Sequence, residues 1–440
     1  MIKSVIIKNF KCIKDLELQL APLTIFVGPN GSGKTGILEA IALMSQAIRG
    51  IGNGHLIEAR KGDLVRIEDE NALFYKGEIE NLLSLGFEVE LEEDESSYVR
   101  KGILEDLEEV SSGEAKTFLS KLKDKKIKNV KYIYSIKLAP YECKHLFYFD
   151  ETQIKYFRDG SNIEAFPKFI SLGDERRFLP TLYVEGRYLR FLENLFQIIR
   201  RRFEKVYYLS SRRDVMNWYK IAEDKELSYV GREGEYTLDV LSRLMRPEND
   251  EKRWPYELIC EEFGVKRIWA GIERGSILTS NYKDPWLNST HKLPSLGHGA
   301  RQLIPIIAQL AISEKGSIVL IDEPEISLHP SYQVKLSILF GNAVMEGKQV
   351  LLTTHSSYFP LSLHKLFDGS LKIEGQTTIG RKERVIKLNV NDVMVYHVDR
   401  SSEGYTVVHR LELDENGLKE GIPSFTKVEI ELLSRFIKGT

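Results

Sequence analysis

The stretch GPNGSGKT at residues 28–35 decides the fold, because it fits the pattern G-x-x-x-x-G-K-[ST] at every defined position. A short apolar segment, residues 23–27, runs into it, and apolar residues at helical spacing follow it from Ile37 to Met44. Glycines in such a loop let successive backbone N–H groups point at phosphate oxygens, and the helix adds its positive N-terminal end. The sequence therefore predicts a phosphate-binding loop between a buried strand and a helix.

The residues of this loop are candidate ligands of ATP. They are Gly28, Pro29, Asn30, Gly31, Ser32, Gly33, Lys34, Thr35 and the following Gly36. Lys34 is expected to reach the β- and γ-phosphates and to assist catalysis, and the Thr35 hydroxyl is expected to bind Mg²⁺. A chance glycine turn is the alternative interpretation, and the strand before the loop and the helix after it argue against that alternative.

A second motif, IVLIDE at residues 318–323, brings two carboxylates to the end of an apolar strand. Ligands of open α/β sheets bind at this carboxyl edge. Asp322 is expected to hold Mg²⁺ through water, and Glu323 is the candidate general base that orients the attacking water. The alternative is an acidic strand end that faces solvent.

Two further features lie close to this motif in the sequence. The apolar strand QVLLTT is followed by His355, where a neutral imidazole can hydrogen-bond the γ-phosphate, although a lone histidine after a strand is more often structural. The segment SLGHGARQLIPIIAQL at residues 295–310 is a glycine-rich turn that leads into a helix. Its Gly297 and Gly299 are candidates for a second anion site at a helix N-terminus.

The composition argues against several classes of protein. The 62 basic and 64 acidic side chains leave a net charge of −2, so no global charge indicates a nucleic-acid or membrane-surface protein. Three scattered cysteines, Cys12, Cys143 and Cys260, are too few for a disulfide framework and fit a reducing compartment. No signal peptide and no run of about 18 apolar residues is seen, so we expect a cytoplasmic protein without a membrane segment.

The domain organisation follows from changes of pattern along the chain. Residues 1–60 are interpreted as the N-terminal part of a nucleotide-binding core, residues 61–290 as an inserted helical and mixed lobe, and residues 291–440 as the C-terminal part of the core. An antiparallel hairpin is predicted ahead of the loop, and an amphipathic helix is predicted at 187–205. The expected fold class is α/β: a P-loop NTPase with a mixed central sheet, an N-terminal antiparallel hairpin and a large inserted α/β lobe.

Taken in order, GPNGSGKT, SLGHGARQ, IVLIDEPEISLHP and TTHS resemble the Walker A, signature, Walker B with D-loop, and switch-histidine motifs of ABC-type ATPases. The version DEPEISLHP, the preceding G-x-G-x-x-Q and the opening MIKSVIIKNFKCIKDLELQL are most similar to the OLD and RecF-like branch, which is grouped with SMC-related AAA-family ATPases. The resemblance covers residues 1–48 and 293–358 and is poor between them.

This resemblance implies an ATPase that uses ATP and Mg²⁺ and forms a head-to-head homodimer. Gly297, Gly299 and their neighbours from one subunit would close on the ATP held by the other. Residues 327–330 would form the D-loop at the dimer seam, and hydrolysis by Glu323 would loosen the pair. The serine of LSGGQ-type signatures is replaced here by Gly297 or His298.

Other expectations concern partners. Gln153 is a candidate for the family's Q-loop glutamine, but an ordinary exposed glutamine is the favoured interpretation. OLD-type relatives carry a C-terminal Toprim nuclease, but the residues after His355 contain no D-x-D, so we expect no built-in nuclease and a separate effector protein. Arg212 and Arg213 could form a nucleic-acid surface with nearby aromatic residues, but a salt-bridged lobe surface is the favoured interpretation. These aromatic residues are Tyr207, Tyr208, Trp218 and Tyr219.

Three functions fit these motifs. The first is an ATP-dependent dimerising switch that acts on DNA or on a partner protein, in DNA repair, DNA metabolism or phage defence. The alternative is the nucleotide-binding subunit of an ABC transporter. The long insertion and the unusual signature argue against this alternative. An SMC-like tether is the third. The sequence argues against it, because it lacks the coiled-coil heptads that a tether requires.

Overall fold

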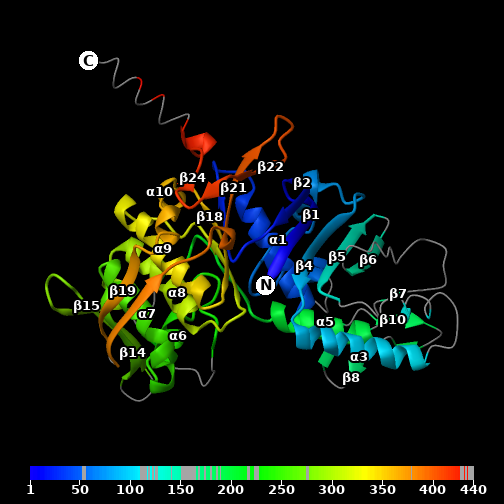
Figure 1. Ribbon diagram of the computed structural model, residues 1–440, viewed down its shortest axis with the longest axis horizontal. Coiled ribbons are helices and arrows are strands. Elements are labelled where there is room, and N and C mark those ends of the chain that lie inside the picture. The colour runs from blue at the N-terminus through cyan, green and yellow to red at the C-terminus, as the bar shows by residue number, and fades with distance from the viewer. Residues whose placement is uncertain are drawn as a thin grey trace. The chain divides into compact units, whose positions relative to one another are not determined.

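In the computed structural model, the chain folds into two compact units (Figure 1). Unit 1 comprises residues 1–20 and 39–206, and unit 2 comprises residues 21–38 and 207–440. The residues that the structure describes are 1–51, 56–109, 116, 119–120, 123, 127–139, 190–215, 227–273, 277–377, 379–426, 431 and 434, together with the backbone of 141–149, 165–166, 169–172, 175–178, 181–184, 187–188 and 219–221.

Unit 1 is built on an antiparallel sheet in the order β2-β1-β4-β5-β6. β1 (Ile2–Phe10) and β2 (Ile13–Gln19) form the hairpin that the alternating apolar residues predict, so this prediction is confirmed. The sheet continues with β4 (Leu83–Glu90), β5 (Asn129–Leu138) and β6 (Tyr141–Phe149).

Two helices of unit 1, α3 (Glu93–Glu109) and α5 (Arg190–Phe203), pack against each other. α5 lies within the helix predicted at 187–205, and its apolar face is buried. The Asp106 carboxylate of α3 accepts the N–H groups of Arg190 and Phe191 at 2.8 and 3.0 Å, because the first turn of a helix leaves such groups without partners. Unit 1 also contains α2 (Leu56–Ala59), β7 (Ala165–Phe166), β8 (Phe169–Leu172), β9 (Glu175–Phe178), β10 (Thr181–Val184) and β11 (Arg187–Tyr188).

Unit 2 contains a sheet in the order β12-β17-β18-β3-β21-β22. β3 (Leu23–Val27) pairs in parallel with β18 (Gln349–Thr354) and β21 (Val393–Arg400), and β18 pairs in parallel with β17 (Ile318–Asp322). Every residue of β3, β17 and β18 is buried, as central strands of a parallel sheet require. β22 (Thr406–Leu411) is antiparallel to β21, so the sheet is mixed, and the carboxyl ends of β3, β17 and β18 meet at one edge.

Helices connect these strands. α1 (Lys34–Ile48) follows β3, α8 (His298–Ile312) precedes β17, and α9 (Pro330–Met345) joins β17 to β18. α6 (Thr237–Leu244) and α7 (Asp250–Glu262) pack against α8 (Figure 1). The remaining elements of this unit are β12 (Val206–Leu209), β13 (Tyr219–Ile221), β14 (Lys266–Glu273), β15 (Ile277–Lys283), β16 (Thr290–Lys292), α10 (Tyr358–Leu361), β19 (Leu371–Thr377), β20 (Gly380–Ile386), β23 (Leu413–Asp414) and β24 (Gly417–Leu418).

The boundaries of the two units differ from the predicted domains 1–60, 61–290 and 291–440. Residues 207–290 belong to unit 2, because α6 and α7 share one apolar core with α8 and the central strands. This core includes Ile25, Leu241, Ile259, Ile306 and Leu352. The sequence shows that these helices have apolar faces, but it does not show which part of the chain covers them.

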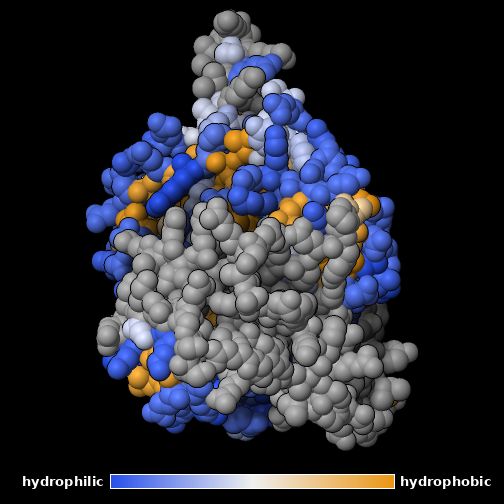
Figure 2. Space-filling view, turned by 90° about the vertical axis from the view of Figure 1, so that its right-hand side faces the viewer, coloured by the Kyte–Doolittle hydropathy of each residue, from blue (hydrophilic) through white to orange (hydrophobic). Residues whose placement is uncertain are grey.

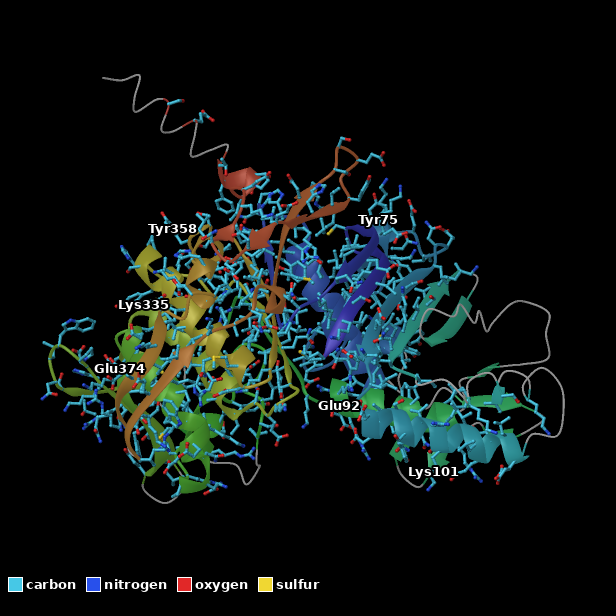
Figure 3. All side chains as sticks on the ribbon, in the orientation of Figure 1. Tyr75, Glu92, Lys101, Lys335, Tyr358 and Glu374 are labelled. Carbon is cyan, nitrogen blue, oxygen red and sulfur yellow. The ribbon has the colours of Figure 1, made fainter. Side chains whose placement is uncertain are left out.

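In the described part of the chain, no helix is both long enough and apolar enough to span a membrane. Hydrophilic residues make up most of the described surface on the face shown in Figure 2, and hydrophobic residues lie in small groups between them. Glu92 and Lys101 in unit 1 and Glu374 in unit 2 are examples of exposed charged side chains (Figure 3).

Candidate nucleotide-binding site

The loop GPNGSGKT joins β3 to α1 within unit 2 and has the backbone of an anion-binding loop. Gly31 has a φ of 73°, a left-handed conformation that residues with a side chain rarely adopt. Gly28 lies so close to β21 that a Cβ atom there would be 2.0 Å from the carbonyl oxygen of Val398. Gly31 is therefore required by its backbone conformation, and Gly28 is required because there is no room for a side chain. α1 begins at Lys34, so its first N–H groups point toward the loop.

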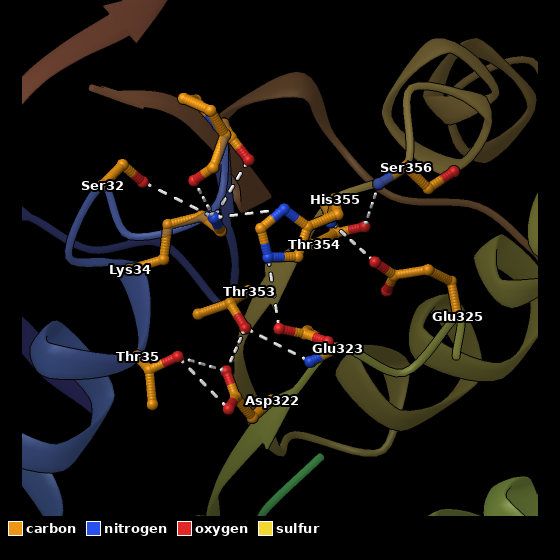
Figure 4. A network of polar contacts seen from close by, with 12 residues as sticks. Ser32, Lys34, Thr35, Asp322, Glu323, Glu325, Thr353, Thr354, His355 and Ser356 are labelled. Atoms are coloured by element: carbon orange, nitrogen blue, oxygen red, sulfur yellow. Dashed lines mark hydrogen bonds and ion pairs between the residues drawn. The ribbon is translucent and has the colours of Figure 1, made fainter. Parts of the chain in front are cut away.

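Lys34 is folded back into this loop (Figure 4). Its Nζ donates to the carbonyl oxygens of Gly28 and Pro29 at 2.9 and 2.8 Å and lies 3.5 Å from Nδ1 of His355. The side chain is buried, and this burial lowers the pKa of the ammonium group to about 8. A cation held by two carbonyl oxygens can exchange them for phosphate oxygens, so the position fits the predicted role, which stays a prediction.

Two residues outside the motif hold the loop in shape. Nε of Arg400, at the end of β21, donates to the Gly31 carbonyl at 2.6 Å, and the Thr406 hydroxyl donates to the Ser32 carbonyl at 2.9 Å. These two bonds tie the Gly31 and Ser32 carbonyls to the C-terminal hairpin and so fix part of the loop's backbone. Neither residue is predictable from the sequence, since the C-terminal hairpin that carries them has no recognisable motif.

The predicted metal ligands Thr35 and Asp322 are in direct contact. The Thr35 hydroxyl lies 3.0 and 3.2 Å from the two carboxylate oxygens of Asp322, and the Thr353 hydroxyl also donates to Asp322. Mg²⁺ prefers oxygen ligands and usually combines one or two protein groups with phosphates and several waters. One hydroxyl beside one carboxylate fits that set. Within the described ranges, no cluster of three His, Cys, Asp or Glu side chains offers a metal site made of protein alone.

Glu323, the candidate general base, sits on strained backbone and faces His355. Its φ of 47° is left-handed, which is rare for a residue with a side chain. Oε1 of Glu323 lies 3.2 Å from Nε2 of His355, and this hydrogen bond is the main cause that lowers the pKa of Glu323 (Figure 4). The carboxylate is therefore deprotonated at neutral pH, as a general base must be.

Glu325 contributes to the site from the buried side. Its Oε1 accepts the backbone N–H of His355 at 2.6 Å, and its burial raises the pKa of the carboxyl group. The contact fixes the end of β18 from which His355 projects. The motif DEPE contains this glutamate, but the sequence does not reveal that its side chain points inward.

The sequence left two interpretations of Arg213 open, a nucleic-acid surface and a salt-bridged lobe surface, and the structure supports neither. Arg213 is 0% exposed and Tyr208 is 1% exposed, so neither can contact a nucleic acid in this fold. The Arg213 guanidinium donates instead to backbone carbonyls around the site. These carbonyls belong to Ser210, Gln302, Asp322 and Glu323. Arg212 is exposed and Tyr207 is half-buried, whereas Trp218 and the side chain of Tyr219 lie outside the described residues.

Gly297 and Gly299 lie at the start of α8, and Gly299 lies against the predicted D-loop of the same chain. A Cβ atom on Gly299 would be 2.4 Å from the carbonyl oxygen of Ser327, and Nδ1 of His298 lies 3.0 Å from the Ser327 hydroxyl. Gly297 faces open space, with no atom within 4 Å of the position of a Cβ atom. Among the described residues, neither glycine is hydrogen-bonded to the loop 28–35. Their contact with a second subunit's ATP stays a prediction.

The other predicted ligands take different positions. Pro29 and Asn30 are exposed, and Gly33 is half-buried. Ser32 and Gly36 are buried, and the Ser32 hydroxyl lies 3.5 Å from Nζ of Lys34. The Q-loop candidate Gln153 lies outside the described residues.

A family model described as "AAA domain, putative AbiEii toxin, Type IV TA system" matches residues 23–362, which include the phosphate loop, Asp322, Glu323 and His355. The chain belongs to this family. The resemblance of the sequence to ABC-type ATPases of the OLD, RecF and SMC-related branch is confirmed, and so is the predicted fold class.

Individual relatives match shorter parts of this AAA-family chain. The OLD nuclease of Thermus scotoductus is 57% identical over 44 residues, which are 10% of this chain and 8% of that protein. The DNA replication and repair protein RecF of Proteus mirabilis is 34% identical over 97 residues, 21% of this chain and 25% of that protein. The match thus spans at most a quarter of these curated relatives. This chain also resembles the crystal structure of an SMC head bound to the C-winged helix domain of ScpA, with a TM-score of 0.51 at 13% identity. The match covers 94% of this chain and 98% of that one, so the two share a fold.

Proposed function

We propose that this chain binds ATP with Mg²⁺ and hydrolyses it. The observation that carries the proposal is the assembly of the predicted catalytic and metal-binding groups at one edge of the unit 2 sheet. These groups are Lys34, Thr35, Asp322, Glu323 and His355. Membership of the AAA family supports nucleotide binding.

Each group has a distinct task in this proposal. The N–H groups of the loop and the ammonium group of Lys34 bind the phosphates. Thr35 and Asp322 would hold Mg²⁺, and this ion would supply the positive charge that neutralises charge developing on the transferred phosphoryl group. The Glu323 carboxylate orients a water for attack on the γ-phosphate and accepts its proton, while His355 holds this carboxylate in place.

We further propose that ATP joins two copies of the chain head to head. The start of α8 in one copy would contact the ATP bound to the other, so that hydrolysis loosens the pair. The open space around Gly297 supports this arrangement, since a glycine without neighbours leaves room for a partner's nucleotide.

The process that this switch serves is proposed to involve DNA. This is supported by the partial matches to an OLD nuclease and to a DNA replication and repair protein. We expect repair, DNA metabolism or phage defence, with DNA contacted directly or through a separate effector protein.

Turnover of ATP by the purified chain tests the proposal. We expect phosphate release that requires Mg²⁺ and stops when EDTA is added. Glu323→Gln should keep ATP affinity, lower kcat by about 100-fold or more and accumulate an ATP-bound dimer, because it removes the base and leaves the phosphate ligands. Glu374→Gln, an exposed glutamate on β19, is the matched control and should behave like the wild type. Unchanged turnover in Glu323→Gln would show that another group is the base.

A further inference from the structure

Arg213, in the loop that follows β12, is among the largest fully buried side chains of the described residues. Burying a guanidinium group is unfavourable unless its N–H groups are bonded and its charge is compensated. Nε donates to the Gln302 carbonyl at 3.0 Å, and Nη1 donates to the carbonyls of Ser210 and Asp322 at 2.8 and 2.6 Å. Nη2 donates to the Glu323 carbonyl at 2.9 Å. All four acceptors are backbone groups, so Arg213 fixes the course of the chain.

Two of these bonds hold the backbone on both sides of Glu323. The carbonyl of Asp322 precedes the Cα atom of Glu323 and the carbonyl of Glu323 follows it, and both are bonded to the planar fork of Arg213. Glu323 has the left-handed φ of 47°, which is unfavourable unless its surroundings impose it. The fork therefore sets the direction in which the Glu323 carboxylate leaves the backbone.

The charge of Arg213 is matched by its surroundings. Burial lowers the pKa of Arg213 to about 10, and the carboxylates of Glu325, Asp322 and Glu323 oppose that lowering. The guanidinium group therefore stays charged at neutral pH. It bonds the backbone carbonyls of Asp322 and Glu323. On the other side of Glu323, the His355 ring contacts both the Glu323 carboxylate and the Lys34 ammonium group.

The same loop is joined to the signature helix α8 in two places. The first is the bond from Arg213 to Gln302, near the N-terminus of this helix. The second is an ion pair of 3.3 Å between the Asp214 carboxylate and Arg301. A shift at the start of α8 therefore acts directly on the loop that holds Glu323.

We propose that Arg213 is a positioning residue that links the signature helix to the catalytic glutamate. It holds the Glu323 carboxylate in its working direction only while the start of α8 is in place, so that the proposed contact of α8 with a partner's ATP promotes hydrolysis. This inference rests on the proposed function, because it assigns Arg213 a part in ATP turnover by Glu323.

The conservative variant Arg213→Lys, paired with Arg212→Lys at the exposed neighbour, tests the inference. Lysine keeps the charge, but its single ammonium group cannot span the carbonyls of Gln302 and Glu323. We expect kcat in Arg213→Lys to fall by at least about tenfold, with the Kd for ATP changed by less than about threefold, because a small misplacement of a catalytic group slows chemistry without removing phosphate ligands. Arg212→Lys should leave both values unchanged. Unchanged kcat in Arg213→Lys, or an equal loss in both variants, overturns the inference.

Hydrogen–deuterium exchange separates this inference from the proposed function, because it requires no turnover. In Arg213→Lys, amide exchange should become faster at 323–326 and at the start of α8, and Arg212→Lys should match the wild type. If the wild-type chain does not hydrolyse ATP, the proposed function fails while faster exchange still supports the positioning role. Unchanged exchange at both segments overturns the inference in either case.

Asp214→Asn provides a second variant in case Arg213→Lys does not fold. It breaks the ion pair with Arg301 and retains Arg213. We expect kcat to fall by a smaller factor, about three- to tenfold, with unchanged affinity for ATP. A kcat equal to that of the wild type would then overturn the inference.

Discussion

The Thr35 hydroxyl lies 3.0 Å from a carboxylate oxygen of Asp322, although 287 residues separate the two in the sequence. The contact forms because β3 and β17 flank β18 in parallel, so both strands end at the same edge of the sheet. Asp322 is the last residue of β17, and Thr35 follows β3 after the turn of the phosphate loop. A hydroxyl and a carboxylate thereby meet where the phosphates of a nucleotide would lie.

The first prediction concerns this pair. Thr35→Val keeps the volume of the side chain but removes its hydroxyl, so we expect the Mg²⁺-dependent gain in ATP affinity to fall by about tenfold or more. Measured in EDTA, the Kd for ATP should equal that of the wild type. Thr35→Ser retains the hydroxyl and serves as control. An equal Mg²⁺ effect in Thr35→Val and in the wild type would exclude the hydroxyl as a metal ligand.

The second prediction is a pH dependence of ATP binding. Burial lowers the pKa of Lys34 to about 8 in the free protein, and bound phosphates favour the ammonium form, so the pKa rises in the complex. The Kd for ATP should therefore be constant below the free pKa and rise with pH above it, by up to about tenfold per pH unit. Titration with a fluorescent ATP analogue between pH 7 and pH 9.5 measures this. A flat curve over that range would mean that Lys34 stays charged without nucleotide.

The motifs were enough to predict the parallel core and which residues meet at its carboxyl edge. The loop at 28–35, the strand that ends at Asp322 and the strand before His355 each have a regular pattern, and parallel strands deliver such ends to one sheet edge. The antiparallel hairpin at the N-terminus was equally visible from its alternation. These features depend on local periodicity, which a single sequence contains.

The supporting contacts depend on tertiary packing, which a single sequence does not contain. Arg213 and Arg212 are adjacent and chemically identical, yet one is fully buried and the other is exposed, because the carbonyls of Asp322 and Glu323 lie within reach of the first. Arg400 reaches the phosphate loop only because β21 pairs with β3. No periodicity records such a pairing across the chain.

The third prediction compares two glycines of the phosphate loop. In Gly28→Ala the new Cβ atom would lie 2.0 Å from the Val398 carbonyl oxygen, so β21 and the loop must separate, and we expect a clear loss of stability and of ATP affinity. In Gly31→Ala the new Cβ atom meets no neighbouring atom. The left-handed backbone at this position should lower the free energy of unfolding by about 1–2 kcal/mol. Thermal unfolding and ATP titration should rank Gly28→Ala as the more severe change. The reverse order would contradict the close approach to β21.

The last prediction separates the fold of the signature from its proposed role between subunits. Gly297 has no atom within 4 Å of a Cβ position, so Gly297→Trp should leave the melting temperature and the Kd for ATP of the single chain unchanged. In the proposed dimer the indole would fill the space of the partner's nucleotide, and we expect the ATP-bound dimer of the Glu323→Gln background to disappear in sedimentation velocity. Gly299→Ala should act differently, since its Cβ atom would lie 2.4 Å from the Ser327 carbonyl oxygen and would lower stability with or without ATP. If Gly297→Trp dimerises with ATP as well as its parent does, the start of α8 does not lie at the interface between subunits.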